Sequence, residues 1–216
     1  LTIWNFGNAG ILIDAGSDGN TVAGNYVGIV GTDGDYHAGS GAGSYGIYVD
    51  GANNTIGGAA AADRNVIGTE RNYGSIVDGA AATGNLVPGN PIGVTAAGTP
   101  SLPGSGTGVT LWLPGSGNTV YHNVIANDSY GLYAYVSNGN SFIGNRIGLS
   151  ADGTATLTGA SVGIMLQGAD GMTVSNNWIG AAGRGLQVLI GSDGNLIQGN
   201  RIGTDQAGTA NWGSTL

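Results

Sequence analysis

The chain of 216 residues contains no cysteine and no lysine, and only 8% of its residues are charged. The absence of cysteine excludes a disulfide framework, a thiolate zinc site and a cysteine nucleophile. All five cationic residues are arginines, against thirteen acidic residues, and the net charge is −8. We expect no nucleic-acid partner, because phosphate neutralisation needs clustered lysine and arginine. No apolar run approaches the roughly 18 residues of a membrane span, so we expect no membrane insertion.

Glycine is abundant, with 45 residues, and it marks an internal repeat. A unit that reads Gly-apolar-x-apolar, a glycine-rich turn, Asn-x-apolar and then Asn-x-apolar-Gly occurs seven times. The first copy is Gly10–Gly28 and the last is Gly185–Gly203. The other copies open at Gly46, Gly74, Gly108, Gly131 and Gly163. Such self-similarity indicates a solenoid whose copies stack on one another.

Two asparagine columns appear when the copies are aligned. One column is filled in all seven copies, by Asn25, Asn65, Asn90, Asn123, Asn145, Asn177 and Asn200. The other is filled by Asn20, Asn54, Asn85, Asn118, Asn140 and Asn195, and Met172 interrupts it. An inward asparagine at a turn can bond to the amide one rung above and below, at a rung spacing of about 4.8 Å. We therefore interpret the complete column as a structural ladder.

The apolar stretches alternate with a period of two, as in Ile11-x-Ile13 and Val109-x-Leu111, which is typical of strands. The length of a copy fits three short strands separated by turns. The connectors between copies alternate between long and short, so we expect long loops along one edge about every 9.6 Å, twice the rung spacing.

The segments GNRIG, GSDGN and SADGTA resemble repeats of the right-handed parallel β-helix family, which shares its fold with pectate lyases. They resemble most closely the repeats of large secreted and surface-attached bacterial proteins. The resemblance implies an all-β, right-handed parallel β-helix of about seven to eight coils and an extracellular or cell-surface location. We predict a single domain over residues 1–216, with a partial coil at 1–9, coils at 10–203 and an open end at 204–216.

An outward column of aspartates is the candidate for chemistry. Asp14, Asp50 and Asp78 would lie about 4.8 Å apart on neighbouring rungs. Glycosidases use pairs of carboxyl groups at comparable separations as their catalytic groups. They are also weak candidates for calcium, as are Asp33 and Asp35 in a connector. The resemblance implies acidic residues, calcium and a basic residue on one outward sheet, but Arg64 and Arg71 fall in connecting segments. Each aspartate lies near a turn glycine, so turn chemistry is the favoured interpretation.

Aromatic residues share the same outward positions: Tyr48, Trp112, Tyr133 and Tyr135. A stripe of this kind indicates a lateral interface or a sugar-stacking platform, unless loops fold over it. The alternatives stay open at this stage.

Neither end of the repeat carries an evident cap, and an open rung of N–H and C=O groups can pair with another chain. The sequence therefore favours a non-enzymatic, extracellular building block of a fibre or surface appendage, whose partners are copies of itself stacked end to end. The alternative is a polysaccharide-binding or polysaccharide-cleaving module that uses the aspartate column. We expect no cofactor, with calcium at the aspartates as the alternative.

Overall fold

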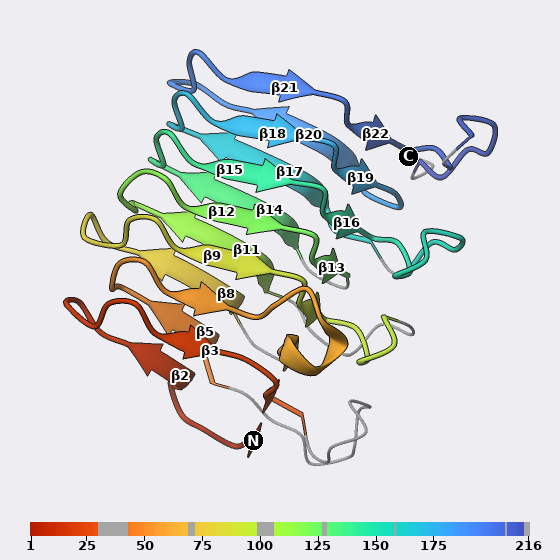
Figure 1. The fold of residues 1–216 in the computed structure, drawn as a ribbon. Helices are drawn as coiled ribbons and strands as arrows, with labels where there is room; N and C mark the ends of the chain where they lie inside the picture. The colour runs from red at the N-terminus through yellow and green to blue at the C-terminus, as the bar shows by residue number, and fades with distance from the viewer. Residues whose placement is uncertain are drawn as a thin grey trace.

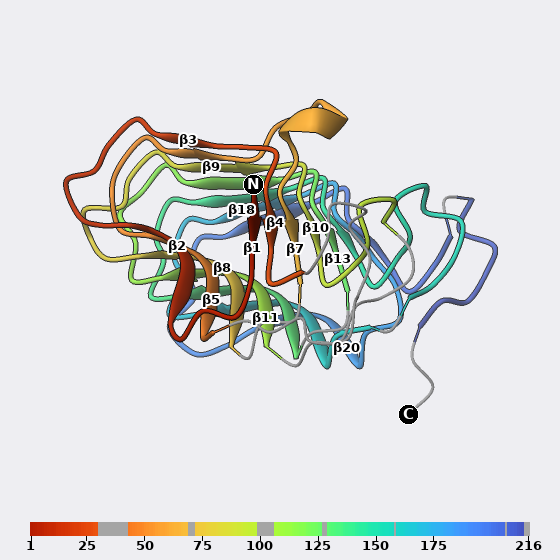
Figure 2. The ribbon, with the colours of Figure 1, turned by 90° about the horizontal axis from the view of Figure 1, so that it is seen from below.

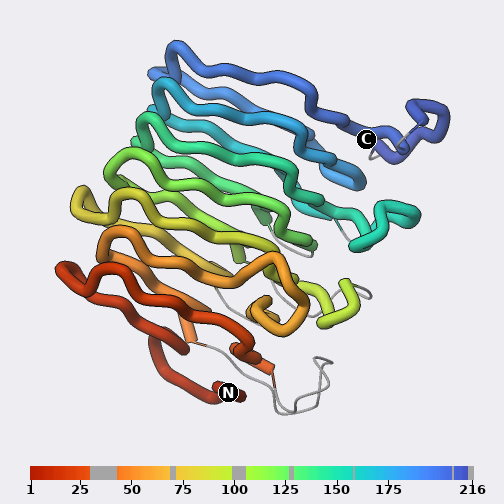
Figure 3. Tube along the Cα trace, in the orientation of Figure 1, coloured from red at the N-terminus to blue at the C-terminus, as the bar shows by residue number. Residues whose placement is uncertain are grey.

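The computed structural model describes residues 1–29, 43–68, 72–98, 106–126, 129–157, 159–205 and 207–213, which form a coil of short strands (Figure 1, Figure 3). The strands align in three parallel sheets, and each sheet takes every third strand of the chain. The chain thus passes through the three sheets once per coil. This confirms the predicted right-handed parallel β-helix.

We name the sheets A, B and C. Sheet A contains β1 (Thr2–Ile3), β4 (Tyr26–Val27), β7 (Val66–Ile67), β10 (Pro91–Ile92), β13 (Val124–Ile125), β16 (Arg146–Ile147), β19 (Trp178–Ile179) and β22 (Arg201–Ile202). Sheet B contains β2 (Ala9–Ile13), β5 (Tyr45–Val49), β8 (Tyr73–Asp78), β11 (Thr107–Trp112), β14 (Tyr130–Tyr135), β17 (Val162–Gln167) and β20 (Arg184–Val188). Sheet C contains β3 (Thr21–Val22), β6 (Thr55–Ile56), β9 (Leu86–Pro88), β12 (Thr119–Tyr121), β15 (Ser141–Ile143), β18 (Thr173–Ser175) and β21 (Leu196–Gln198).

The hydrophobic core runs along the axis of the coil, between the three sheets (Figure 2). In each strand of sheet B, alternate side chains point inward; in β5 these are Ile47 and Val49, both fully buried. The largest fully buried side chain is Phe142 in β15. Burial of each such aliphatic side chain stabilises the fold by about 1.5–3 kcal/mol, and each rung completes the core of its neighbours.

The complete asparagine column forms a continuous ladder at the corner between sheets C and A. Each side-chain Nδ2 donates to the Oδ1 of the asparagine on the next coil, from Asn25 through to Asn200, at 2.9–3.2 Å. Each backbone N–H donates to the same Oδ1. Because these amides lie inside the corner, the ladder satisfies polar groups that would otherwise be unpaired in the core.

The second asparagine column, at the corner between sheets B and C, is broken where Met172 replaces asparagine. Before the break, Asn118 Nδ2 donates to Asn140 Oδ1 at 3.1 Å. At the break, Asn140 Nδ2 turns to the hydroxyl of Ser137 at 3.0 Å, since Met172 offers no carbonyl. The buried Nδ2 atoms of Asn54 and Asn195 in this column have no hydrogen-bond partner among the described residues.

The opening glycine of a repeat is the second residue of a sheet B strand, as Gly131 is in β14 and Gly163 is in β17. A Cβ added to Gly163 would approach the Ile179 Cγ2 and the Gly185 carbonyl oxygen to 2.5 Å each. Gly131 meets Ile147 and the Gly163 carbonyl in the same way. In both cases the branched side chain of the isoleucine fills the space that the absent Cβ leaves, so the glycine and the isoleucine of a repeat depend on each other for packing.

The described parts of the last two long connectors, 149–157 and 207–213, leave the coil along the same edge (Figure 1), while most of the first long connector lies outside the described residues. Both of these last connectors are small hairpins, closed by antiparallel bridges between Leu149 and Thr156 and between Thr204 and Asn211. A short 3-10 helix at Ala61–Asp63 widens one corner, and no repeat pattern predicted it. The described residues include no helix with the length and hydropathy of a membrane span.

Candidate functional site

The outer face of sheet B carries the side chains that the sequence singled out. The strand register places one column on it as expected: Leu12, Tyr48, Ile76, Thr110, Tyr133, Met165 and Gln187. Beside it, Asp78 pairs with Trp112, which pairs with Tyr135 and then Gln167. Asp14 and Asp50 follow the paired residues Ile13 and Val49 on the earlier rungs.

A third column, missed by the sequence analysis, completes the aromatic surface. Tyr45, Tyr73, Thr107 and Tyr130 stand at one register position, immediately before the opening glycines. The recurring Tyr-Gly pairs are the sequence signal for this column, which precedes the glycine rather than following it.

The rings contact one another along the coil. Tyr45 stacks on Tyr73 with ring centroids 5.5 Å apart, and Tyr45 meets Tyr48 edge-on at 5.1 Å. Further along, Trp112 stacks on Tyr135 at 4.2 Å and Tyr130 stacks on Tyr133 at 5.4 Å. We call these seven half-buried residues the aromatic strip: Tyr45, Tyr48, Tyr73, Trp112, Tyr130, Tyr133 and Tyr135.

The outward column is not a uniformly exposed stripe. Ile76, Thr110 and Met165 point outward but are only 3%, 0% and 7% exposed. The solvent-exposed part of this face therefore consists of the half-buried aromatic rings on the neighbouring rungs. The Thr110 hydroxyl is buried and has no hydrogen-bond partner in the part of the chain that the structure describes.

Where Thr107 interrupts the tyrosine column, the surface is hollowed. Tyr45, Tyr73, Thr107 and Tyr130, together with Asn72, Gly106 and Ser129, line an open groove of about 450 Å³. The small threonine leaves a gap of one rung between two tyrosines, and neighbouring rungs are about 4.8 Å apart.

The aspartate column lies beside the first part of the aromatic strip. Tyr48 donates its phenolic hydrogen to Asp78 Oδ2 at 2.5 Å. Burial, and after it the bond to Asp78, raises the pKa of the Tyr48 phenol, so the hydroxyl stays a donor at neutral pH. Burial, and after it the carboxylates of Asp78 and Asp14, raises the pKa of Asp50. Ionised Asp50 therefore opposes folding at neutral pH, and this cost disappears in acid.

No group of three or more His, Cys, Asp or Glu side chains is arranged to hold a metal ion in the part of the chain that the structure describes. Asp14 is exposed, and Asp78 is engaged by Tyr48. The other two calcium candidates, Asp33 and Asp35, lie outside the described residues, as does Arg71.

Comparison with known proteins places the chain in a family. The family model described as "Periplasmic copper-binding protein (NosD)" matches residues 105–215, just over half of the 216 residues. The chain belongs to the NosD family. No curated protein matches this NosD-family chain.

Two solved structures show the same fold. The crystal structure of the periplasmic alginate epimerase AlgG matches with a TM-score of 0.63 and 18% identity over 93% of this NosD-family chain and 43% of the AlgG chain. A point mutant of AlgG matches with a TM-score of 0.64 and 17% identity, over 93% of this chain and 44% of that one. The chain thus spans less than half of the AlgG chain, and the likeness is one of fold.

The NosD family description names copper, but the described residues contain no group of side chains arranged to bind a copper ion. Copper in proteins is bound mainly by histidine, cysteine and methionine. The chain has no cysteine, and His37 lies outside the described residues. Met165 is on sheet B, Met172 is at the corner before β18, and His122 is at the corner before β13. These side chains come from separate parts of the coil, so they do not fit a copper centre.

Proposed function

We propose that the chain is a glycan-binding module of an extracytoplasmic β-helix protein. The observation that carries the proposal is the aromatic strip. Pyranose rings present apolar C–H faces that stack on aromatic rings, and tyrosine adds a hydroxyl for hydrogen bonding. The strip continues from β5 to β14, three rung spacings or about 14 Å, which suits an extended chain rather than a single sugar. Asp50, Asp78 and Gln167 supply polar groups along its side.

An extracytoplasmic location is supported by the NosD family and by the AlgG structures, since both are described as periplasmic proteins. The parallel β-helix and its corner ladders need no disulfide to hold them. We propose that the glycan lies on the outer face of sheet B, parallel to the axis of the coil, and crosses the groove at Thr107.

We expect the chain to bind a neutral polysaccharide, such as a soluble β-glucan or galactomannan, and Trp112→Ala to weaken binding about tenfold, or about 1.4 kcal/mol. The Trp112 ring stacks on Tyr135 and contacts Tyr133, so its removal breaks the strip in the middle. Affinity electrophoresis against a panel of neutral polysaccharides measures the effect.

Trp4→Ala is the matched control, because Trp4 is 49% exposed and stands outside sheet B. Its affinity is expected to equal that of the unmodified chain. Equal retardation of both variants, or no retardation of the unmodified chain by any member of the panel, contradicts glycan binding by the strip.

We propose end-to-end assembly as a second function, because the three parallel sheets and the asparagine ladder continue from coil to coil through the same bonds, and a second copy can extend them. Val188, Ile197 and Ile202 occupy inward register positions and are 42%, 44% and 47% exposed. The proposed occupant is the first coil of a second copy. A head-to-tail contact would continue the ladder from one copy to the next.

Light scattering over a concentration series tests this assembly. We expect growth into filaments, and Ile202→Asp is expected to abolish it by placing a charge in the junction. Ile190→Asp is the control, since Ile190 is 99% exposed in a turn. A monomer at every concentration, or equal growth of Ile202→Asp, overturns the proposal.

A further inference from the structure

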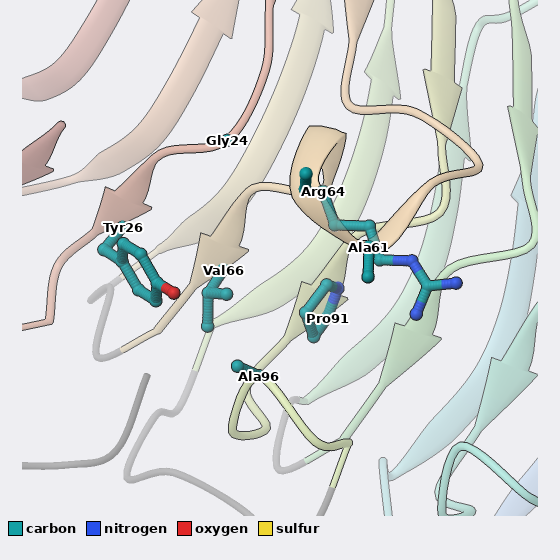
Figure 4. Close-up of a pocket in the computed structure, with 8 residues that line it drawn as sticks. Gly24, Tyr26, Ala61, Arg64, Val66, Pro91 and Ala96 are labelled. Atoms are coloured by element: carbon teal, nitrogen blue, oxygen red, sulfur yellow. The ribbon is translucent and has the colours of Figure 1, made fainter. Parts of the chain in front are cut away.

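Three of the five arginines and one of the two histidines gather on the outer side of sheet A. They line hollows that share residues and so form one groove. Arg64, Pro91 and Ala96 belong to both the first and the second hollow, while His122 and Arg146 belong to both the second and the third. Figure 4 shows the beginning of this groove, where the Arg64 side chain extends past Ala61 and away from Tyr26. We call Arg64, His122, Arg146, Trp178 and Arg201 the arginine groove.

The strand register fixes the spacing of the charges. Arg146, Trp178 and Arg201 are successive partners in β16, β19 and β22. The two guanidinium carbons lie 6.0 Å and 5.8 Å from the centre of the Trp178 ring. Both guanidinium groups therefore lie within cation–π distance of the Trp178 ring, and their backbones are two rungs or about 9.6 Å apart.

Trp178 itself is held rigidly. Its indole N–H donates to the Thr204 carbonyl at 2.7 Å, and its ring stacks on Trp212 at 5.9 Å. It is 8% exposed, so it serves as a spacer for the arginines rather than as a contact surface.

The arginines of the groove have few partners of their own. Within the described part of the chain, the buried Nε atoms of Arg64 and Arg146 have no hydrogen-bond partner, and Arg64 Nη2 donates to the Ala59 carbonyl at 3.2 Å. Among the residues that the structure describes, no aspartate or glutamate lines any of the three hollows. Asp152, in the neighbouring hairpin, accepts hydrogen bonds from Ser150 and Thr154, which lower its pKa to about 2. Asp152 is therefore ionised at neutral pH, but its carboxylate is already hydrogen-bonded within its own turn.

Guanidinium groups without a carboxylate partner among the described residues, in a chain of net charge −8, point to a ligand of opposite charge. The arginines are spread along several coils rather than converging on one point, so one small anion would leave most of them unpaired. A nucleic acid is disfavoured, because the rest of the surface would repel a dense row of phosphates.

We propose that the arginine groove binds a linear anionic glycan, with carboxylates on its sugars paired to Arg64, Arg146 and Arg201. This site is on a different face from the aromatic strip and does not depend on the proposed function. The groove follows the axis of the coil, as an extended glycan chain would.

Calorimetry with a hexameric oligogalacturonate tests the proposal, with its methyl ester as the uncharged counterpart. We expect the acid to bind at about 50 mM salt, more weakly as salt is raised, and the ester not to bind. Arg146→Gln and Arg201→Gln are each expected to lower the affinity about tenfold. Arg201 is exposed, so the second variant keeps the test valid if the first fails to fold.

Arg184→Gln is the matched control, because it removes the same charge from an exposed arginine on β20 in sheet B. It should bind as the unmodified chain does. Equal weakening by Arg184→Gln, equal binding of the ester, or equally tight binding of inorganic phosphate alone overturns the proposal. Trp112→Ala should retain oligogalacturonate binding, so this result and the test of the aromatic strip can fail separately.

Discussion

Replacement of Asn123 by alanine is expected to lower the free energy of unfolding by about 3–5 kcal/mol. Asn123 is fully buried in the middle of the complete ladder. Its Oδ1 accepts from the backbone N–H and Nδ2 of Asn90, and its Nδ2 donates to the Val87 carbonyl and to Asn145 Oδ1. Alanine leaves several of these buried groups unpaired at once, and each unpaired group costs about 1–3 kcal/mol.

Equilibrium unfolding in urea, followed by circular dichroism, measures this loss. Asn72→Ala is the control, because Asn72 is exposed and its side chain makes no hydrogen bond among the described residues. Its effect should stay within about 0.5 kcal/mol. A loss of less than about 1 kcal/mol for Asn123→Ala would show that solvent or a shifted backbone replaces the ladder.

Gly163→Ala is expected to lower the melting temperature by about 5–10 °C, which corresponds to about 2–3 kcal/mol in a chain of this size. The added methyl group would overlap the Ile179 side chain and the Gly185 carbonyl of the next coil. Neither neighbour can retreat without disturbing its own rung, because Ile179 is packed in the core.

Gly7→Ala separates this clash from the general effect of removing a glycine. A Cβ at Gly7 meets nothing within 4 Å, and its melting temperature should change little. Differential scanning calorimetry compares the two variants. Equal melting temperatures would mean that the rungs can move apart at Gly163 at little cost.

The fold followed from the sequence because its determinants recur at fixed spacing. Each copy repeats the glycine that permits close packing and the asparagine that bonds to the next coil, so aligning the copies also aligned the rungs. The outward columns of sheet B were predicted for the same reason, and the register places Tyr48, Trp112 and Tyr135 as expected.

The sites were harder to foresee, because their residues follow no repeat. Tyr45, Tyr73 and Tyr130 precede the glycine and fell outside the columns considered. The burial of Thr110 depends on what the neighbouring rungs carry, which strand periodicity does not describe. Arg64 is in a connector and Arg146 in a strand, so only the three-dimensional coil brings them to the same groove.

The complete asparagine ladder has an electrical consequence. From Asn65 to Asn200, each Oδ1 accepts from the asparagine of the preceding coil, so these carbonyls all point toward the start of the chain. Aligned amide dipoles polarise one another and add, as peptide dipoles do along an α-helix. The ladder is therefore a polarised rod inside the corner of the coil, negative toward Asn25 and positive toward Asn200. Two such rods attract when they meet head to tail and repel when like ends meet.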